Sequence, residues 1–182
     1  MQPTRLTLPP LSSLDSTSIT CAIDTPNGQA IRSAHQKVSG LHPAAGGEGE
    51  EISGELCSGD MLLEALVACS GVTLKAVASA LSVPIQSGKV YAEGDLDFRG
   101  TLGVDKTAPV GFKEIRLSFD LKMKPGEECK QETIEKLGKL TERYCVVLQT
   151  IAKRPELKVR VDGVTEEEPG LERSVAWAEK MQ

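Results

Sequence analysis

The sequence predicts one domain that mixes helices with antiparallel strands, and three segments support this prediction. A nearly continuous apolar run over residues 60–81 has the length of a long helix and stops before Pro84. Residues 85–99 and 111–123 alternate enough between apolar and polar side chains to form strands of a sheet with one wet face. Residues 100–110 join these two strands as a hairpin.

Shorter elements complete the prediction, and composition divides the chain into three parts. Residues 1–17 are rich in Pro, Ser and Thr and are expected to form an extended arm, 18–163 form the core domain, and 164–182 form a charged tail. The further expected elements are a hairpin of 18–23 and 29–35 around Pro26-Asn-Gly28, a Gly- and Glu-rich loop at 39–59, helices at 132–144 and 146–152, a strand at 157–161 and a short tail helix at 171–182.

Composition narrows the function. At 182 residues, with 40% hydrophobic and 26% charged residues, the chain can bury one sizeable core. A net charge of −5 and an aromatic content of only 3% argue against a nucleic-acid partner. The N-terminus lacks the pattern of a secretory signal, and we expect no segment apolar enough to span a bilayer. The expected location is the cytoplasm, with no membrane partner.

Two of the five cysteines stand out as a candidate redox pair. Cys69 lies within the long apolar helix, and Cys145 follows the helix predicted at 132–144, 76 residues later. The odd number of cysteines and the absence of a C-x-x-C spacing favour free or redox-active thiols over a disulfide framework. Cys21 and Cys129 are expected to be bystanders.

The surroundings of Cys69 leave its role open. It lies about 140° around the helix from Glu64, at about 100° per residue. Apolar burial raises the pKa of a thiol, so reactivity requires a cation or a helix N-terminus nearby. Inert packing is the alternative for both cysteines. The polar stripe on the helix consists of Glu64, Gly71, Lys75, Ser79 and Ser82, and the neighbours of Cys69 are Leu62, Ala65, Leu66, Val72 and Ala76.

At these residues the chain resembles the OsmC/Ohr family, the osmotically inducible and organic hydroperoxide resistance proteins. The resemblance rests on the loop-to-helix segment 57–74 and on Glu142-Arg-Tyr-Cys-Val-Val-Leu-Gln-Thr150. It implies an α+β fold in which a long central helix packs against antiparallel strands, within an intertwined homodimer. It also implies a thiol peroxidase that acts on organic hydroperoxides, uses an external thiol or dithiol as reductant, and needs no metal or other cofactor.

Carried over by position, the resemblance makes Cys69 the peroxidatic thiolate and Cys145 the resolving thiol. Arg32 is the positional candidate for the arginine that holds the thiolate, or else a solvent-facing strand residue. Asp60 falls where many relatives carry glutamate, and a helix cap is its alternative role. The chain departs from the family where Val146 replaces the proline that directly follows the second cysteine.

Cys57 is a further departure from the family, as an alternative resolving thiol or a loop residue.

Other functions are less well supported by the sequence. His35 and His42 lie near the long loop and no Gly-x-Ser-x-Gly motif occurs, which argues against a serine hydrolase. No Cys or His pair has the spacing of zinc ligands. The main alternative is a non-enzymatic dimeric module that binds a hydrophobic small molecule and uses its cysteines for packing.

Overall fold

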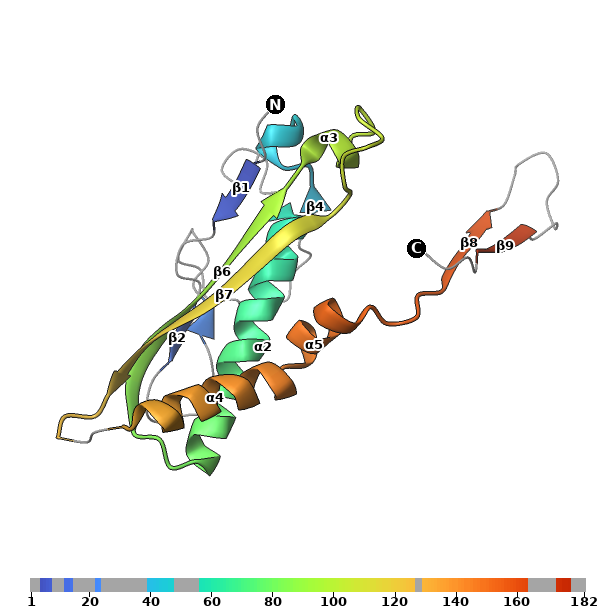
Figure 1. Cartoon of the computed structure of the whole chain (residues 1–182). Helices are drawn as coiled ribbons and strands as arrows, with labels where there is room; N and C mark the ends of the chain where they lie inside the picture. Colours follow the sequence, from blue (N-terminus) through green and yellow to red (C-terminus); the bar gives the residue numbers. More distant parts are fainter. Residues whose placement is uncertain are drawn as a thin grey trace. The chain divides into compact units, whose positions relative to one another are not determined.

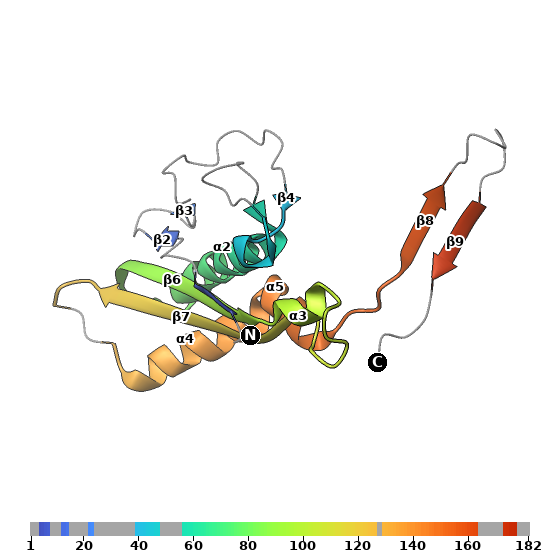
Figure 2. The same cartoon turned by 90° about the horizontal axis from the view of Figure 1, so that it is seen from above.

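The structure is a computed structural model that describes residues 4–7, 12–14, 22–23, 39–47, 56–126, 129–163 and 173–177. The chain divides into two compact units, residues 1–149 and 150–182. Figure 1 shows the secondary structure and Figure 2 shows it from above. The first unit carries the long helix, the main sheet and both cysteines of the candidate pair.

The centre of the first unit is helix α2 packed on a long hairpin (Figure 1). Helix α2 spans Ser58–Ala80, strand β6 spans Ile85–Leu96 and strand β7 spans Phe112–Met123. Strands β6 and β7 pair antiparallel along nearly their whole length. The predicted helix and both predicted strands are therefore confirmed, with boundaries shifted by a few residues, and the α+β fold class is confirmed with them.

Short N-terminal strands extend this sheet. Strands β1 (Thr4–Thr7) and β2 (Ser12–Leu14) each pair antiparallel with β6, and β3 (Ala22–Ile23) pairs with β2. Within the expected extended arm over residues 1–17, residues 4–7 and 12–14 are thus paired with a strand that is far away in the sequence. In the predicted hairpin, residues 29–35 lie outside the described residues.

The Gly- and Glu-rich segment before α2 also holds short regular elements. Strands β4 (Ser39–Gly40) and β5 (Leu56–Cys57) form a parallel pair, and the 3₁₀ helix η1 covers Pro43–Ala45. His42 caps η1, since its Nδ1 accepts a hydrogen bond of 3.0 Å from the Ala44 amide. The His42 ring also stacks on Phe98 at 5.1 Å. Both observations place His42 in a structural role.

Among the described residues, three further helices lie within or after the hairpin. Helix α3 lies in the connection between β6 and β7, and α4 and α5 follow β7. Helix α3 (Phe98–Thr101) starts at Asp97, whose carboxylate accepts hydrogen bonds from Arg99. Helix α4 (Gln131–Tyr144) packs against α2 through the buried side chain of Leu137, and helix α5 (Val146–Lys153) follows after one residue. The predicted helices at 132–144 and 146–152 are confirmed within one residue at each end.

The second unit contains a two-stranded antiparallel hairpin. Strand β8 (Val159–Gly163) pairs with β9 (Arg173–Trp177). The tail helix expected at 171–182 was therefore wrong over 173–177. The sequence Arg-Ser-Val-Ala-Trp contains a β-branched and an aromatic residue, which favour a strand. The division of the chain at residues 17 and 163 stays a prediction.

The two faces of α2 differ in burial from the simple expectation. Most of the expected polar stripe is inside: Glu64 and Lys75 are each 8% exposed and Gly71 is buried, whereas Ser79 and Ser82 are exposed. In contrast, Leu62 and Val72 are 39% and 42% exposed. Apolar side chains on one face of α2 are therefore exposed in the described part of the chain, and the face with two charged residues packs into the fold.

Helix α2 is also long and apolar enough to cross a membrane by length and composition alone. The expectation that no segment reaches this limit was therefore wrong. More than half of the apolar stretch of α2 is buried inside the fold, and the buried Glu64 and Lys75 lie on the same helix. These features are those of the central helix of a packed unit.

Candidate active site

The path of the backbone at Cys145 shapes the candidate site. The Cys145 amide donates the last hydrogen bond of α4, to the Thr141 carbonyl at 3.0 Å. Cys145 itself is extended, with φ −71° and ψ 109°, and this conformation breaks the helix. Helical bonding resumes when the Gln149 amide donates to the Cys145 carbonyl at 2.9 Å. Cys145 is thus the C-cap of α4 and directly precedes α5.

The first amides of α5 are directed at the two sulfur atoms. The N–H groups in the first turn of a helix have no carbonyl partner within that helix. The amides of Val146 and Val147 donate to the Cys69 sulfur, the amide of Leu148 donates to the Cys145 sulfur, and the Val147 amide is shared with the Cys145 sulfur. Cys145 therefore caps α5 much as serine caps other helices, with sulfur as the acceptor.

These amides change the acidity of Cys69. Burial alone raises the pKa of the Cys69 thiol, but the hydrogen bonds from Val147, Cys145, Val146 and Thr73 together bring that pKa below its ordinary value. The positive end of the α5 dipole acts in the same direction. Among the described residues, the groups that lower this pKa are amides, a thiol and a hydroxyl.

Cys145 has the opposite character. Its side chain is 0% exposed, and burial raises the pKa of its thiol. The hydrogen bond to Cys69 and the charge on Cys69 raise it further. The hydrogen bond between the two thiols therefore makes Cys69 the more acidic partner and Cys145 the donor. The predicted juxtaposition of the two cysteines is present, with the lower pKa on Cys69.

The Thr73 hydroxyl contributes from the next turn of α2. It donates to the Cys69 carbonyl at 2.8 Å and also lies within reach of the Cys69 sulfur. A hydroxyl has one proton, so it serves one acceptor at a time. Thr73 consequently provides a minor and shared donor.

The surface around Cys69 is apolar and partly open. Cys69 itself is half-buried. Leu62 and Val72, seven residues before and three after it, are exposed on the same helix, and Val146 at the start of α5 is 71% exposed. The thiol is therefore reachable from a surface that carries apolar side chains.

The other predicted site residues are not brought to the thiol pair by the described structure. Arg32 and Cys21 lie outside the described residues. Asp60 lies in the first turn of α2, roughly 13 Å along the helix axis from Cys69 at about 1.5 Å per residue. Asp60 is not the N-cap of α2, so its expected alternative role as a helix cap was wrong: that position belongs to Cys57.

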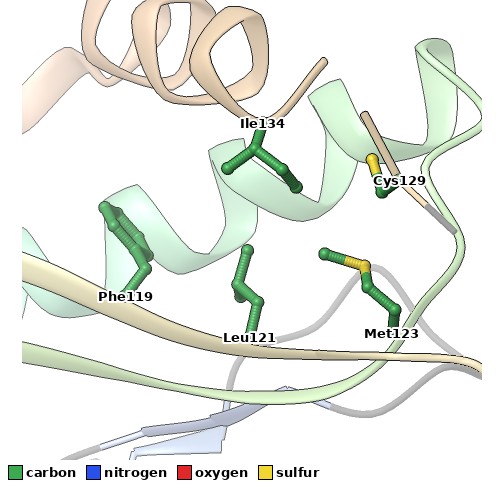
Figure 3. A pocket seen from close by; sticks show the side chains of 5 residues that line it. All are labelled: Phe119, Leu121, Met123, Cys129 and Ile134. Atoms are coloured by element: carbon green, nitrogen blue, oxygen red, sulfur yellow. The ribbon is translucent and has the colours of Figure 1, made fainter. Parts of the chain in front are cut away.

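A separate apolar hollow lies between β7 and the start of α4 (Figure 3). It has a volume of about 320 Å³. Five side chains line it: Phe119, Leu121, Met123, Cys129 and Ile134. Cys129 lines this hollow, whereas Cys69 and Cys145 do not, and its role as a bystander stays a prediction. Within the described ranges, no group of three or more potential ligands could hold a metal ion.

The amide donors were missed by reasoning from side chains. The sequence does predict a helix that starts right after Cys145, and every helix start offers free N–H groups. What the sequence does not reveal is that α5 begins beside the middle of α2 (Figures 1 and 2). The direction of those amides is a property of the tertiary structure.

Comparison with known proteins identifies the family. The sequence profile of the OsmC-like proteins matches residues 49–160, which is more than half of the chain. The chain belongs to the OsmC-like family. Its matched region begins just before α2 and includes both cysteines of the pair, and the predicted resemblance is confirmed.

Individual relatives are remote. One solved structure with a similar fold is the crystal structure of an OsmC-like hydroperoxide resistance protein from Jannaschia sp. CCS1. The two chains are 15% identical, with a TM-score of 0.47, over 63% of this chain and 69% of the other. No curated protein matches the chain significantly.

Proposed function

We propose that this OsmC-like protein is a thiol peroxidase that reduces organic hydroperoxides with Cys69 as nucleophile and Cys145 as resolving thiol. The observation that carries the proposal is the contact between the two thiols at the N-terminus of α5, where Cys69 is the more acidic partner. Membership of the OsmC-like family supports a peroxide-related role.

The chemistry needs only the two thiols and a reductant. The Cys69 thiolate attacks the terminal oxygen of ROOH, the O–O bond breaks, and the alkoxide leaves and takes up a proton as ROH. Cys69 becomes a sulfenic acid. The Cys145 sulfur then attacks the Cys69 sulfur, water leaves, and a disulfide forms. An external dithiol returns both cysteines to thiols and is itself oxidised to a disulfide.

The open apolar surface beside Cys69 supports an organic substituent on the peroxide. Leu62, Val72 and Val146 present exposed hydrophobic side chains near the thiol pair. Each Å² of apolar surface removed from water contributes about 25 cal/mol. A cumyl or alkyl group gains this contribution and hydrogen peroxide does not, so we expect faster turnover of cumene hydroperoxide than of hydrogen peroxide.

The same surface supports a homodimer as the working form. An apolar face that crosses the site, with Leu62 and Val72 about 40% exposed, is more stable when a second copy covers it. The expected observation is a dimer at micromolar concentration by light scattering. A monomer at that concentration contradicts the proposed assembly. The proposal also includes a cytoplasmic location. It further includes Arg32 and Asp60 as the charged groups of the site.

The deciding experiment combines turnover with mass spectrometry. With a dithiol present, the protein is expected to consume cumene hydroperoxide, and one equivalent of peroxide should form a Cys69–Cys145 disulfide. Cys69→Ser should abolish turnover, whereas Cys145→Ser should leave a sulfenic acid that dimedone traps on Cys69. Cys129→Ser is the matched control and should keep full activity. Absence of turnover with intact, folded protein contradicts the proposal.

The alternative of a non-enzymatic module for hydrophobic small molecules makes a different prediction at Cys69. If the cysteines serve only for packing, Cys69 should react with a maleimide at pH 6 no faster than a thiol of ordinary pKa, about 8.5. The donors around the Cys69 sulfur instead favour faster reaction at that pH.

A further inference from the structure

The break between α4 and α5 leaves a specific set of backbone groups to be satisfied. In a continuous helix, the amides of Val146, Val147 and Leu148 would bond the carbonyls four residues earlier, beginning with Glu142. At the break, those amides turn to the sulfur atoms of Cys69 and Cys145. The carbonyls that they abandon need other donors or water.

The Gln149 side chain supplies one of these donors. Its Nε2 donates to the Glu142 carbonyl at 2.9 Å, across the break. In a straight helix, the Glu142 carbonyl would instead accept a hydrogen bond from the Val146 amide. The Gln149 backbone amide also donates to the Cys145 carbonyl at 2.9 Å. One residue thus bonds both sides of the break, through its side chain to α4 and through its backbone to Cys145.

We propose that Gln149 is a positioning residue of the Cys69 site. Its side-chain amide occupies the Glu142 carbonyl in place of the Val146 amide, and this exchange leaves the Val146 and Val147 amides free to bind the Cys69 sulfur. Gln149 acts through the backbone and does not itself touch the sulfur. This inference rests on the proposed function only because Gln149 is proposed to prepare the same thiol, Cys69.

The exchange works because nothing covalent prevents α4 from continuing into α5. Val146 has an N–H and is compatible with a helix, whereas a proline at that position would forbid the continuation. Without the Gln149 donor, the straight form regains the bond from the Val146 amide to the Glu142 carbonyl and becomes better populated. In the straight form the Cys69 sulfur loses two of its backbone donors.

The test measures the pH dependence of Cys69 alkylation by iodoacetamide, read by peptide mass spectrometry on the full chain. Gln149→Met removes the donor at similar size and without a charge. We expect the midpoint for Cys69 to rise by about half to one pH unit, which is a threefold to tenfold loss of thiolate below the midpoint. Gln86→Met, the same change at an exposed site on β6, is the control and should leave the midpoint unchanged.

A double-mutant cycle separates this mechanism from any other effect of Gln149. Val146→Pro removes one donor but enforces the break, because proline favours the first position of a helix and cannot continue α4. On that background, Gln149→Met should shift the midpoint by less than a third of its effect in the parent chain. A shift of equal size on both backgrounds overturns the proposal, as does an unchanged midpoint in Gln149→Met alone.

This experiment is independent of catalysis. Alkylation requires no peroxide and no reductant, so a protein that lacks peroxidase activity still tests the role of Gln149. Circular dichroism and thermal unfolding of each variant establish that the chain remains folded. If Gln149→Met fails to fold, Gln149→Glu, which has the same shape and no donor, replaces it, and an unchanged or lowered midpoint in that variant also overturns the proposal.

Discussion

Replacing Cys145 by alanine isolates what its thiol contributes to the reactivity of Cys69. The Cys145 S–H is one of the donors to the Cys69 sulfur, and it sits on a fully buried side chain. A typical hydrogen bond contributes about 1 kcal/mol net, and a thiol is a weak donor, so about 0.5–1 kcal/mol is expected here. Since one pKa unit corresponds to about 1.36 kcal/mol, the pKa of Cys69 should rise by about half a unit in Cys145→Ala.

Cys145→Ser separates this effect from the loss of the resolving thiol. Serine keeps an O–H donor at the same position, so the pKa of Cys69 should stay closer to that of the parent chain. Both variants lack the second thiol, and both should accumulate a sulfenic acid on Cys69 after peroxide. The assay is the rate of Cys69 alkylation from pH 5 to pH 10.

The alkylation midpoint of Cys69 in Cys145→Ala can refute the proposed role of Cys145. The alkylation rate follows the thiolate fraction, so a higher pKa moves the rise of the rate to higher pH and lowers the rate below the midpoint. Cys129→Ala, at the separate hollow, should not move the midpoint. If Cys145→Ala leaves the midpoint in place or lowers it, the thiol of Cys145 does not stabilise the Cys69 thiolate and the assignment of roles fails.

Further predictions concern other parts of the structure. Thr73→Val should raise the midpoint of the nucleophilic thiol by less than Cys145→Ala does, because its single proton is shared with a carbonyl, and Thr73→Ser should not raise it. Leu137→Ala should lower the free energy of unfolding by about 2–5 kcal/mol in urea titrations, whereas Val104→Ala, at an exposed site, should change it by less than about 0.5 kcal/mol. The hydrogen bonds from Arg99 hold the pKa of Asp97 at about 2, below its ordinary value of 3.8. Stability from this pair is therefore present above pH 3.8 and lost as the pH falls towards about 2, and Asp97→Asn should lack this acid-dependent loss in thermal unfolding.

Local patterns predicted the elements whose residues are periodic over a long stretch. The apolar run of α2 and the alternation in β6 and β7 each extend over more than ten residues, and their types followed from the sequence. The short strands β1 and β2 did not, because a strand of three or four residues depends on a partner that is distant in the sequence. The prediction of which α2 side chains are buried failed for the same reason. Glu64 and Lys75 are buried because of the elements that pack on them.

The candidate site divides in the same way. Cys69 and Cys145 were predicted from the residues themselves and from the family resemblance, because side-chain identity is visible in a sequence. Two of the four donors to the Cys69 sulfur, the amides of Val146 and Val147, are backbone groups, and backbone amides are the same for every residue except proline. Only the position of α5 beside α2 determines which amides reach the sulfur.

The residue directly after the second cysteine then takes on a physical meaning. The family resemblance led to the expectation of a proline directly after the second cysteine, and this chain has Val146 at that position. Proline breaks the helix by itself but has no N–H, whereas valine keeps an N–H that donates to the Cys69 sulfur. The substitution therefore adds a donor to the thiolate and removes the covalent constraint that holds the break. The bond from Gln149 to the Glu142 carbonyl takes over that constraint, so the gain at Val146 depends on a side chain three residues later.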